Sequence, residues 1–229
     1  MVIKGLQKTS LIDYPGYICA TAFAFGCNFR CPYCHNPELV NGGAELPDIP
    51  IPELMDFLRR RRDLLDGLTV TGGEPLIHAG LPEFLAGVKA LGLRVKLDTN
   101  GSNPFLLQRL LSEGLVDFIA LDVKSSPSRY SEAIGVPAPL SNIEKSLRLT
   151  LESGCEYELR CTILPRLHDE RTLRELGEFV RGAETLCLQR FRSVKVLDPS
   201  YADEPSFTED EMSRFAELLG EYVGCCRVR

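Results

Sequence analysis

Residues 94–124 read RVKLDTNGSNPFLLQRLLSEGLVDFIALDVK, and this stretch decides the fold. Its pattern predicts a strand over Arg94–Asp98, a helix over Pro104–Glu113 and a second strand over Phe118–Asp122. The helix begins on a proline, which suits a first turn, and is followed by Gly114, which suits a left-handed helix cap. A strand, a helix and a strand in this order indicate two parallel strands joined by a right-handed crossover.

The same alternation runs through the rest of the chain and predicts an α/β protein with a parallel sheet. About six such units are too few for a complete eight-stranded (TIM-type) barrel, so periodicity alone leaves either an open doubly wound sheet or an incomplete barrel. The segment Ser141–Glu144 also reads as a capping box. We see no linker and expect residues 1–229 to form one domain. The remaining predicted strands are Tyr17–Phe25, Leu68–Thr71, Glu156–Leu164 and part of Thr185–Val196, and the remaining predicted helices are Ile51–Leu65, Leu81–Leu91, Ser141–Ser153, Arg171–Arg181 and Thr208–Val223.

The charge and the apolar content of the chain limit the kinds of partner that we expect it to bind. The 229 residues carry a formal charge of −6, and the only basic cluster, Arg59–Arg62, lies in an amphipathic helix pattern. Direct nucleic-acid binding needs clustered lysine and arginine, so we expect no nucleic-acid partner. No apolar stretch is long enough to cross a membrane and no signal peptide opens the chain, so we expect a cytoplasmic protein without a membrane partner.

The nine cysteines are many for such a chain, and in a reducing compartment clustered cysteines indicate metal ligands. Cys27, Cys31 and Cys34 fall within eight positions on a turn-rich loop. Three thiolates would leave one iron of a cubane iron–sulfur cluster open, as a catalytic centre requires. Two alternatives stay open: His35 as the fourth ligand of a zinc site, or Cys19 as the fourth ligand of an electron-transfer cluster.

Polar and glycine-rich turns follow several predicted strands: Gly72-Gly73-Glu74-Pro75, Asp98-Thr99-Asn100-Gly101 and Asp122-Val-Lys124. The carboxyl ends of parallel strands share one rim, so we expect these residues to lie together. Each motif alone is weak, since a turn, a helix cap or a solvated lysine would explain it. Arg160, inside a predicted strand, fits a salt bridge or a ligand contact equally well.

The spacing C-x3-C-x2-C with Tyr33 before the last cysteine resembles the radical S-adenosylmethionine (SAM) superfamily. That resemblance implies an incomplete barrel in which Cys27, Cys31 and Cys34 hold a [4Fe–4S] cluster. SAM would chelate the open iron and be cleaved reductively to a 5′-deoxyadenosyl radical. The resemblance further implies a monovalent cation near the two aspartates. By the same resemblance, the residues that would contact SAM are Tyr33, Gly72, Gly73, Glu74, Asp98, Thr99, Asp122, Lys124 and Arg160.

The whole chain resembles one subgroup, the activating proteins of anaerobic ribonucleoside-triphosphate reductase. The matching segments are Lys4–Gly16, Cys34–Pro37, Leu121–Lys124, Glu158–Arg160 and Leu188–Phe191. The resemblance implies hydrogen-atom abstraction from a glycine of a glycyl radical enzyme, with flavodoxin or ferredoxin as the electron donor. It places Asp13 near the target glycine loop and His35 near SAM, the two residues we expect to be catalytic.

Pyruvate formate-lyase-activating enzymes share most of these motifs, but the histidine they carry after their last core strand is absent here. Asp198-Pro-Ser-Tyr201 occupies that stretch, and Cys161 and the pair Cys225-Cys226 match nothing in the pattern. A formate-lyase-type activase and a radical SAM enzyme acting on a small molecule remain the alternatives.

Overall fold

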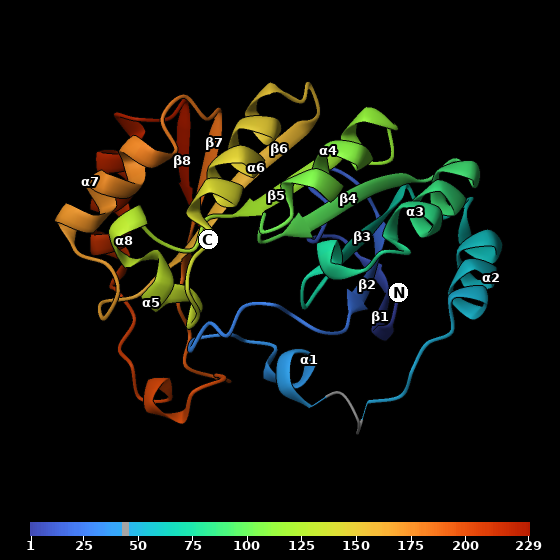
Figure 1. The fold of residues 1–229 in the computed structure, drawn as a ribbon, viewed down its shortest axis with the longest axis horizontal. Helices are drawn as coiled ribbons and strands as arrows, with labels where there is room; N and C mark the ends of the chain where they lie inside the picture. The colour runs from blue at the N-terminus through green and yellow to red at the C-terminus, as the bar shows by residue number, and fades with distance from the viewer. Residues whose placement is uncertain (43–45) are drawn as a thin grey trace.

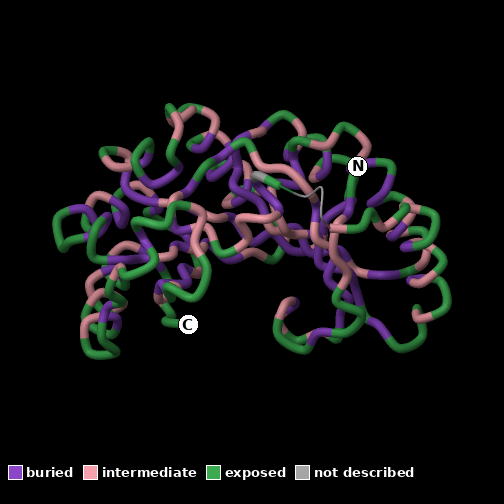
Figure 2. Tube along the Cα trace, turned by 90° about the horizontal axis from the view of Figure 1, so that it is seen from below, coloured by how far each residue is buried: buried purple, intermediate pink, exposed green. Residues whose placement is uncertain are grey.

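The computed structural model describes residues 1–42 and 46–229 and contains one eight-stranded sheet. The strands are β1 (Ile3–Ser10), β2 (Cys19–Ala24), β3 (Gly67–Gly72), β4 (Arg94–Thr99), β5 (Phe118–Asp122), β6 (Glu156–Ile163), β7 (Thr185–Arg190) and β8 (Cys225–Val228). They lie side by side in chain order, and every neighbouring pair is parallel except β1 with β2. The sheet bends into an arc with helices on its outer side (Figures 1 and 2).

This arrangement confirms the α/β fold and the incomplete barrel. The helices are α1 (Pro37–Asn41), α2 (Ile51–Arg61), α3 (Leu81–Ala90), α4 (Pro104–Ser112), α5 (Tyr130–Ile134), α6 (Leu140–Glu152), α7 (Glu170–Phe179) and α8 (Glu209–Gly220). Sequence analysis missed the edge strands β1 and β8. The seventh strand, Thr185–Arg190, lies within the range Thr185–Val196, part of which was predicted as a strand.

The main apolar core fills the space between the outer helices and the sheet. Leu54 and Leu58 of α2 are fully buried, whereas Arg59 and Arg60 on the opposite face are exposed. Burying a leucine side chain contributes about 2 kcal/mol, so the amphipathic pattern suffices to hold α2 against the sheet. The arginine cluster is therefore a solvated helix face.

The ends of the helices follow the sequence in most places. The Asn103 side chain accepts a hydrogen bond from the Leu106 amide at 3.2 Å and caps α4, and Gly114 has φ +64° after that helix. The capping box predicted at Ser141 is wrong. The helix α6 begins one residue earlier, at Leu140, and its N-cap Pro139 has no side chain that can accept a hydrogen bond.

Most side chains on the concave side of the arc are polar. A cluster of three aromatic rings, which we call the aromatic floor, lies at one end of it. Tyr14, Tyr17 and Phe118 pack edge to face, with ring centroids 4.9 and 5.8 Å apart. These rings lie at the amino-terminal ends of the parallel strands, because Phe118 is the first residue of β5. Ligands are therefore expected toward the opposite, carboxyl ends.

Candidate active site

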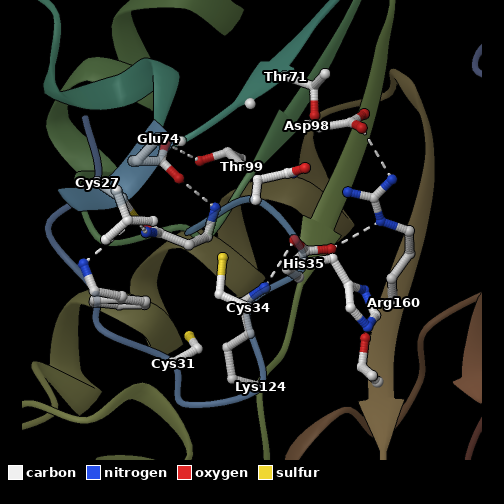
Figure 3. Close-up of a pocket in the computed structure, with 18 of the residues that line it drawn as sticks. Cys27, Cys31, Cys34, His35, Thr71, Glu74, Asp98, Thr99, Lys124 and Arg160 are labelled. Atoms are coloured by element: carbon white, nitrogen blue, oxygen red, sulfur yellow. Dashed lines mark hydrogen bonds and ion pairs between the residues drawn. The ribbon is translucent and has the colours of Figure 1, made fainter. Parts of the chain in front are cut away.

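The cysteine loop follows β2 and faces a cavity of about 250 Å³ that all three of its cysteines line. The loop is held by backbone bonds to distant segments. The amide of Arg30 donates to the Ile134 carbonyl at 2.8 Å, and the amide of Asp198 donates to the Pro32 carbonyl at 2.9 Å. Ile134, the last residue of α5, and the segment after β7 thus both hold this loop in place. Figure 3 shows the three cysteines at the cavity together with Glu74, Lys124 and Arg160.

The chemistry of this donor set fits an iron–sulfur cluster. Burial raises the pKa of the Cys27 thiol to about 11 and that of the Cys31 thiol to about 12, so binding iron must release protons. Within residues 1–42 and 46–229, no three histidine, cysteine or acidic side chains converge on a point that would hold a single metal ion. A cubane cluster does not need that convergence, since each thiolate binds a different iron.

Of the two competing fourth ligands, His35 lines the same cavity as the three cysteines and Cys19 does not. His35 Nε2 is 2.9 Å from the carbonyl oxygen of Arg192, and its ring stacks on Phe191 at 5.8 Å. Cys19 begins β2, roughly 17 Å of extended chain before the loop, and belongs to the aromatic floor. The Nε2 atom of His35 therefore already has a hydrogen-bond partner, and Cys19 lies outside the cavity.

The glycine pair after β3 packs backbone to backbone against the cysteine loop. A Cβ on Gly73 would lie 2.0 Å from the carbonyl oxygen of Gly26, and Gly72 has φ +111°. The Glu74 amide donates to that same Gly26 carbonyl at 2.8 Å. The close approach that these glycines permit is therefore between two segments of this chain.

Glu74 links the glycine turn to the end of β4. Its carboxylate is 1% exposed and accepts hydrogen bonds from the Leu76 amide, the Thr99 hydroxyl and the Asn100 amide at 2.9, 2.6 and 2.7 Å. Burial raises its pKa to about 7 despite these donors. A carboxylate offers roughly four acceptor positions, so one remains for an ammonium group in the cavity.

A chain of alternating charges crosses the concave face. Arg160 bridges the two aspartates, donating to Asp98 Oδ2 at 3.0 Å and to Asp122 Oδ1 at 2.8 Å. Lys124 Nζ donates to Asp122 Oδ2 at 2.9 Å, and Lys96 pairs with Asp98 Oδ1. Arg160 thus makes the salt bridges that one interpretation predicted. It also lines the cavity, where it could make the ligand contact that the other predicted.

These contacts set the charge states of the network. Burial alone would raise the pKa of Asp122, but Arg160 and Lys124 outweigh it and lower the pKa to about 2. Burial would lower the pKa of Lys124, but the Asp122 carboxylate raises it well above its ordinary value. Asp122 and Lys124 are therefore both ionised at neutral pH.

The cavity brings together nearly the whole predicted set of site residues. All three cysteines, Tyr33, His35, the glycine turn with Glu74, and Asp98, Thr99, Asp122, Lys124 and Arg160 line it. The sequence prediction omitted Asn100, Gln189 and Lys96. For Lys96 a signal existed, because residues two apart on a strand share a face and Lys96 precedes Asp98 by two.

Asp13 lies in a second cavity, of about 460 Å³, that shares Asp98, Arg160 and Gln189 with the first. Its Oδ2 accepts a hydrogen bond from the Thr21 hydroxyl at 2.8 Å. Among the residues that the structure describes, no cation pairs with Asp13, whereas Glu158 in the same cavity pairs with Arg229 at 2.9 Å. Asp13 therefore offers a free carboxylate oxygen beside the wall common to both cavities.

One further expectation from the sequence is wrong. A histidine in a predicted loop, such as His168, is expected at the surface, but His168 is buried and its Nδ1 accepts a hydrogen bond from the Leu164 amide at 3.2 Å. The monovalent cation stays a prediction, and the two aspartates beside which it is expected pair with Arg160, Lys96 and Lys124.

Comparisons with known proteins identify the family. Residues 21–181 match the Radical SAM superfamily. The chain is 27% identical over 230 residues to a putative glycyl-radical enzyme activating enzyme of Methanocaldococcus jannaschii, which covers 97% of this chain and 93% of that protein. It is 30% identical over 191 residues to the pyruvate formate-lyase-activating enzyme of Clostridium pasteurianum, with coverage of 79% and 76%.

Solved structures agree on the fold. SuiB of Streptococcus suis, bound to SAM, superposes with a TM-score of 0.68 at 16% identity over 90% of this chain, which spans about half (51%) of that chain. The structure of anSMEcpe with bound SAM gives a TM-score of 0.58 at 19% identity over 87% of this chain. Within the described residues, no helix combines the length and apolar character that a membrane crossing requires. This chain belongs to the radical SAM superfamily of enzymes, which use a [4Fe–4S] cluster and SAM, and is homologous over nearly its whole length to glycyl-radical-enzyme activating enzymes.

Proposed function

We propose that this protein, as one radical SAM domain, cleaves SAM and generates a glycyl radical on a partner enzyme. The observation that carries the proposal is the pair of adjoining cavities, which share Asp98, Arg160 and Gln189. The first is lined by the three cysteines and suits the cluster and SAM. The second is polar and lies beside the first, where a segment of a partner could bring a glycine close to the reacting carbon of SAM.

The chain's own residues would divide the work as follows. Cys27, Cys31 and Cys34 would hold the cluster, which when bound and reduced supplies the electron that cleaves SAM to a 5′-deoxyadenosyl radical. The free acceptor position of Glu74 would receive the ammonium group of SAM. Asp13 would accept a backbone N–H of the entering glycine segment and hold its Cα toward the first cavity.

For the partner we propose anaerobic ribonucleoside-triphosphate reductase. Two segments that resemble its activating proteins, Lys4–Gly16 and Leu188–Phe191, supply Asp13 and Gln189 to the cavities. Asp198 lies in the stretch where formate-lyase activators carry a histidine, and its side chain instead accepts a hydrogen bond from the Ser200 amide at 2.9 Å. A flavodoxin or ferredoxin is the proposed electron donor.

The test uses the anaerobically reconstituted protein, SAM, dithionite and either purified reductase or pyruvate formate-lyase. We expect 5′-deoxyadenosine with wild type, and the doublet electron-paramagnetic-resonance signal of a glycyl radical with the reductase. A partner labelled with α-dideuterated glycine should transfer one deuterium into 5′-deoxyadenosine. A glycyl radical on the formate-lyase alone would reassign the partner, and 5′-deoxyadenosine without deuterium from either protein would reject the activase function.

Variants separate the two cavities. Cys31→Ala should abolish SAM cleavage, because the cluster loses a ligand. Asp13→Asn should leave SAM cleavage without a partner within about two-fold of wild type and lower glycyl-radical yield about ten-fold, because the N–H would then meet a neutral acceptor in place of a charged one. Equal loss of both activities in Asp13→Asn would refute its proposed role.

A further inference from the structure

Lys96 is a buried lysine on the concave side of the sheet, and none of the roles proposed above uses its positive charge. It lies on β4, its side chain is 2% exposed, and its ammonium group pairs with Asp98 Oδ1 and lies 5.7 Å from the centroid of the Phe118 ring. A buried ammonium is costly unless it is paired, so its retention here calls for a reason.

The ion pairs give every carboxylate oxygen of the two aspartates one cationic partner. On Asp98, Lys96 takes Oδ1 and Arg160 takes Oδ2. On Asp122, Arg160 takes Oδ1 and Lys124 takes Oδ2. A sodium or potassium ion binds through oxygen ligands, and each anionic oxygen of this pair already has a cationic partner.

The net charge of this network also argues against a bound sodium or potassium ion. Lys96, Arg160 and Lys124 face two carboxylates, so the network carries one net positive charge. That surplus suits a bound carboxylate such as the one on the methionyl part of SAM. A further cation would add a second unpaired positive charge among groups that are already cationic, which is unfavourable in a desolvated site.

We propose that Lys96 is the built-in counter-cation of the Asp98–Asp122 pair, and that SAM binding by this protein requires no sodium or potassium ion. This inference rests on the use of SAM and not on the identity of the partner. It differs from the arrangement that the family resemblance implies, in which a bound monovalent cation balances the two aspartates.

The experiment measures the Kd of SAM by titration calorimetry on the reconstituted holoprotein. The protein is exchanged into tetramethylammonium chloride, and sodium or potassium chloride then replaces that salt at constant ionic strength. We expect the wild-type Kd to be the same within two-fold in the three salts. A wild-type affinity that falls ten-fold or more without sodium or potassium, and returns on their addition, would overturn the proposal.

Lys96→Met removes the ammonium and keeps an unbranched chain. We expect SAM binding by this variant to weaken by about ten-fold in tetramethylammonium and to recover in sodium or potassium, since a small cation can then take the vacated place beside Asp98. Unchanged, salt-independent binding by a folded, cluster-loaded Lys96→Met protein would refute the role of Lys96. If this variant does not fold, the wild-type salt series still decides the cation requirement.

The matched control is Lys89→Met. Lys89 Nζ pairs with both oxygens of Asp117 at 2.7 Å, on a helix of the outer layer and outside both cavities. This change removes a comparable ion pair, so its SAM affinity should stay salt-independent. A wild-type protein that binds no SAM in any salt would reject the proposed function itself, which is a different outcome from a cation requirement.

Discussion

At the scale of single residues, Gly73 sets how close the glycine turn can approach the cysteine loop. The Cβ of any larger residue would lie 2.0 Å from the carbonyl oxygen and 2.7 Å from the carbonyl carbon of Gly26. Both contacts are with backbone, which cannot rotate away as a flexible side chain can. Gly26 directly precedes Cys27, so a displacement here moves a proposed cluster ligand.

We therefore expect Gly73→Ala to lose most of the cluster absorbance near 400 nm after reconstitution, and to be about 2 kcal/mol less stable in urea unfolding. Gly220→Ala is the control, because Gly220 ends α8, is exposed, and leaves open space within 4 Å of an added Cβ. It should load the cluster normally. Equal cluster content in both variants would show that the close approach can relax.

Two buried titratable groups make opposite contributions to stability as pH changes. Burial lowers the pKa of His168 to about 4, so between pH 6.5 and 4 the unfolded chain binds a proton that the native protein lacks. This contribution falls as the pH falls. Burial raises the pKa of Glu74 to about 7, so between pH 7 and 4.5 the native protein binds the extra proton, and its contribution rises as the pH falls.

The two effects should largely offset each other in the wild-type protein without its cluster. As the pH falls from 7 to 5, the unfolding free energy of His168→Gln should rise relative to that of wild type by about 2 kcal/mol. The unfolding free energy of Glu74→Gln should fall relative to wild type by a similar amount over the same range. Urea unfolding at pH 7, 6 and 5 gives these differences. Parallel pH profiles for the three proteins would contradict the assignment.

At the scale of elements, the helix starts show where a capping motif acts. Asp169 caps α7, its side chain accepting from the Thr172 amide at 2.8 Å, and Thr208 caps α8 in a reciprocal box with Glu211. The segment Ser141–Glu144 has the same S/T-x-x-E pattern as Thr208–Glu211, yet α6 begins before it. The motif acts only where its first residue lies outside the helix.

We expect Asp169→Ala to lower the unfolding free energy by about 1 kcal/mol, because α7 loses its capping hydrogen bond. Ser141→Ala should change it by less than about 0.5 kcal/mol, since the exposed Ser141 caps nothing in α6. Thermal and urea unfolding of both variants measure the contrast. A larger loss in Ser141→Ala than in Asp169→Ala would mean that α6 starts where the sequence pattern places it.

At the scale of the whole molecule, the incomplete barrel leaves one cavity for the cofactors and a second beside it. Ile12, next to Asp13 on the loop between β1 and β2, lines the second cavity and is 83% exposed. An apolar side chain this exposed beside a polar cavity suits contact with a protein partner.

Ile12→Glu should therefore leave folding and SAM cleavage without a partner unchanged, and should weaken glycyl-radical formation on the reductase several-fold at subsaturating partner. Phe105→Glu is the control, because Phe105 is also largely exposed but lies on the outer helix α4. Radical yield measured against partner concentration separates the two. Identical curves for Ile12→Glu and wild type would exclude this loop from the partner contact.

Sequence patterns were enough to predict the alternation of strands and helices, the cysteine loop and the identities of most cavity residues. Each of these depends on local spacing: strand and helix periodicity, three cysteines on one turn-rich loop, and polar turns at the ends of parallel strands. The same periodicity missed β1 and β8, because a strand at a sheet edge is half exposed and shows no continuous apolar run.

Which charges meet between strands depends on the tertiary structure. The pairing of Asp98 with Arg160 joins β4 to β6 across β5, and sequence spacing cannot report contacts that depend on how a sheet curves. The burial of His168 and the contact of Gly73 with Gly26 likewise depend on segments distant in the chain. The sequence thus specifies the chemical groups of the site, and the curvature of the sheet specifies their partners, because burial and charge pairing are properties of the packed chain.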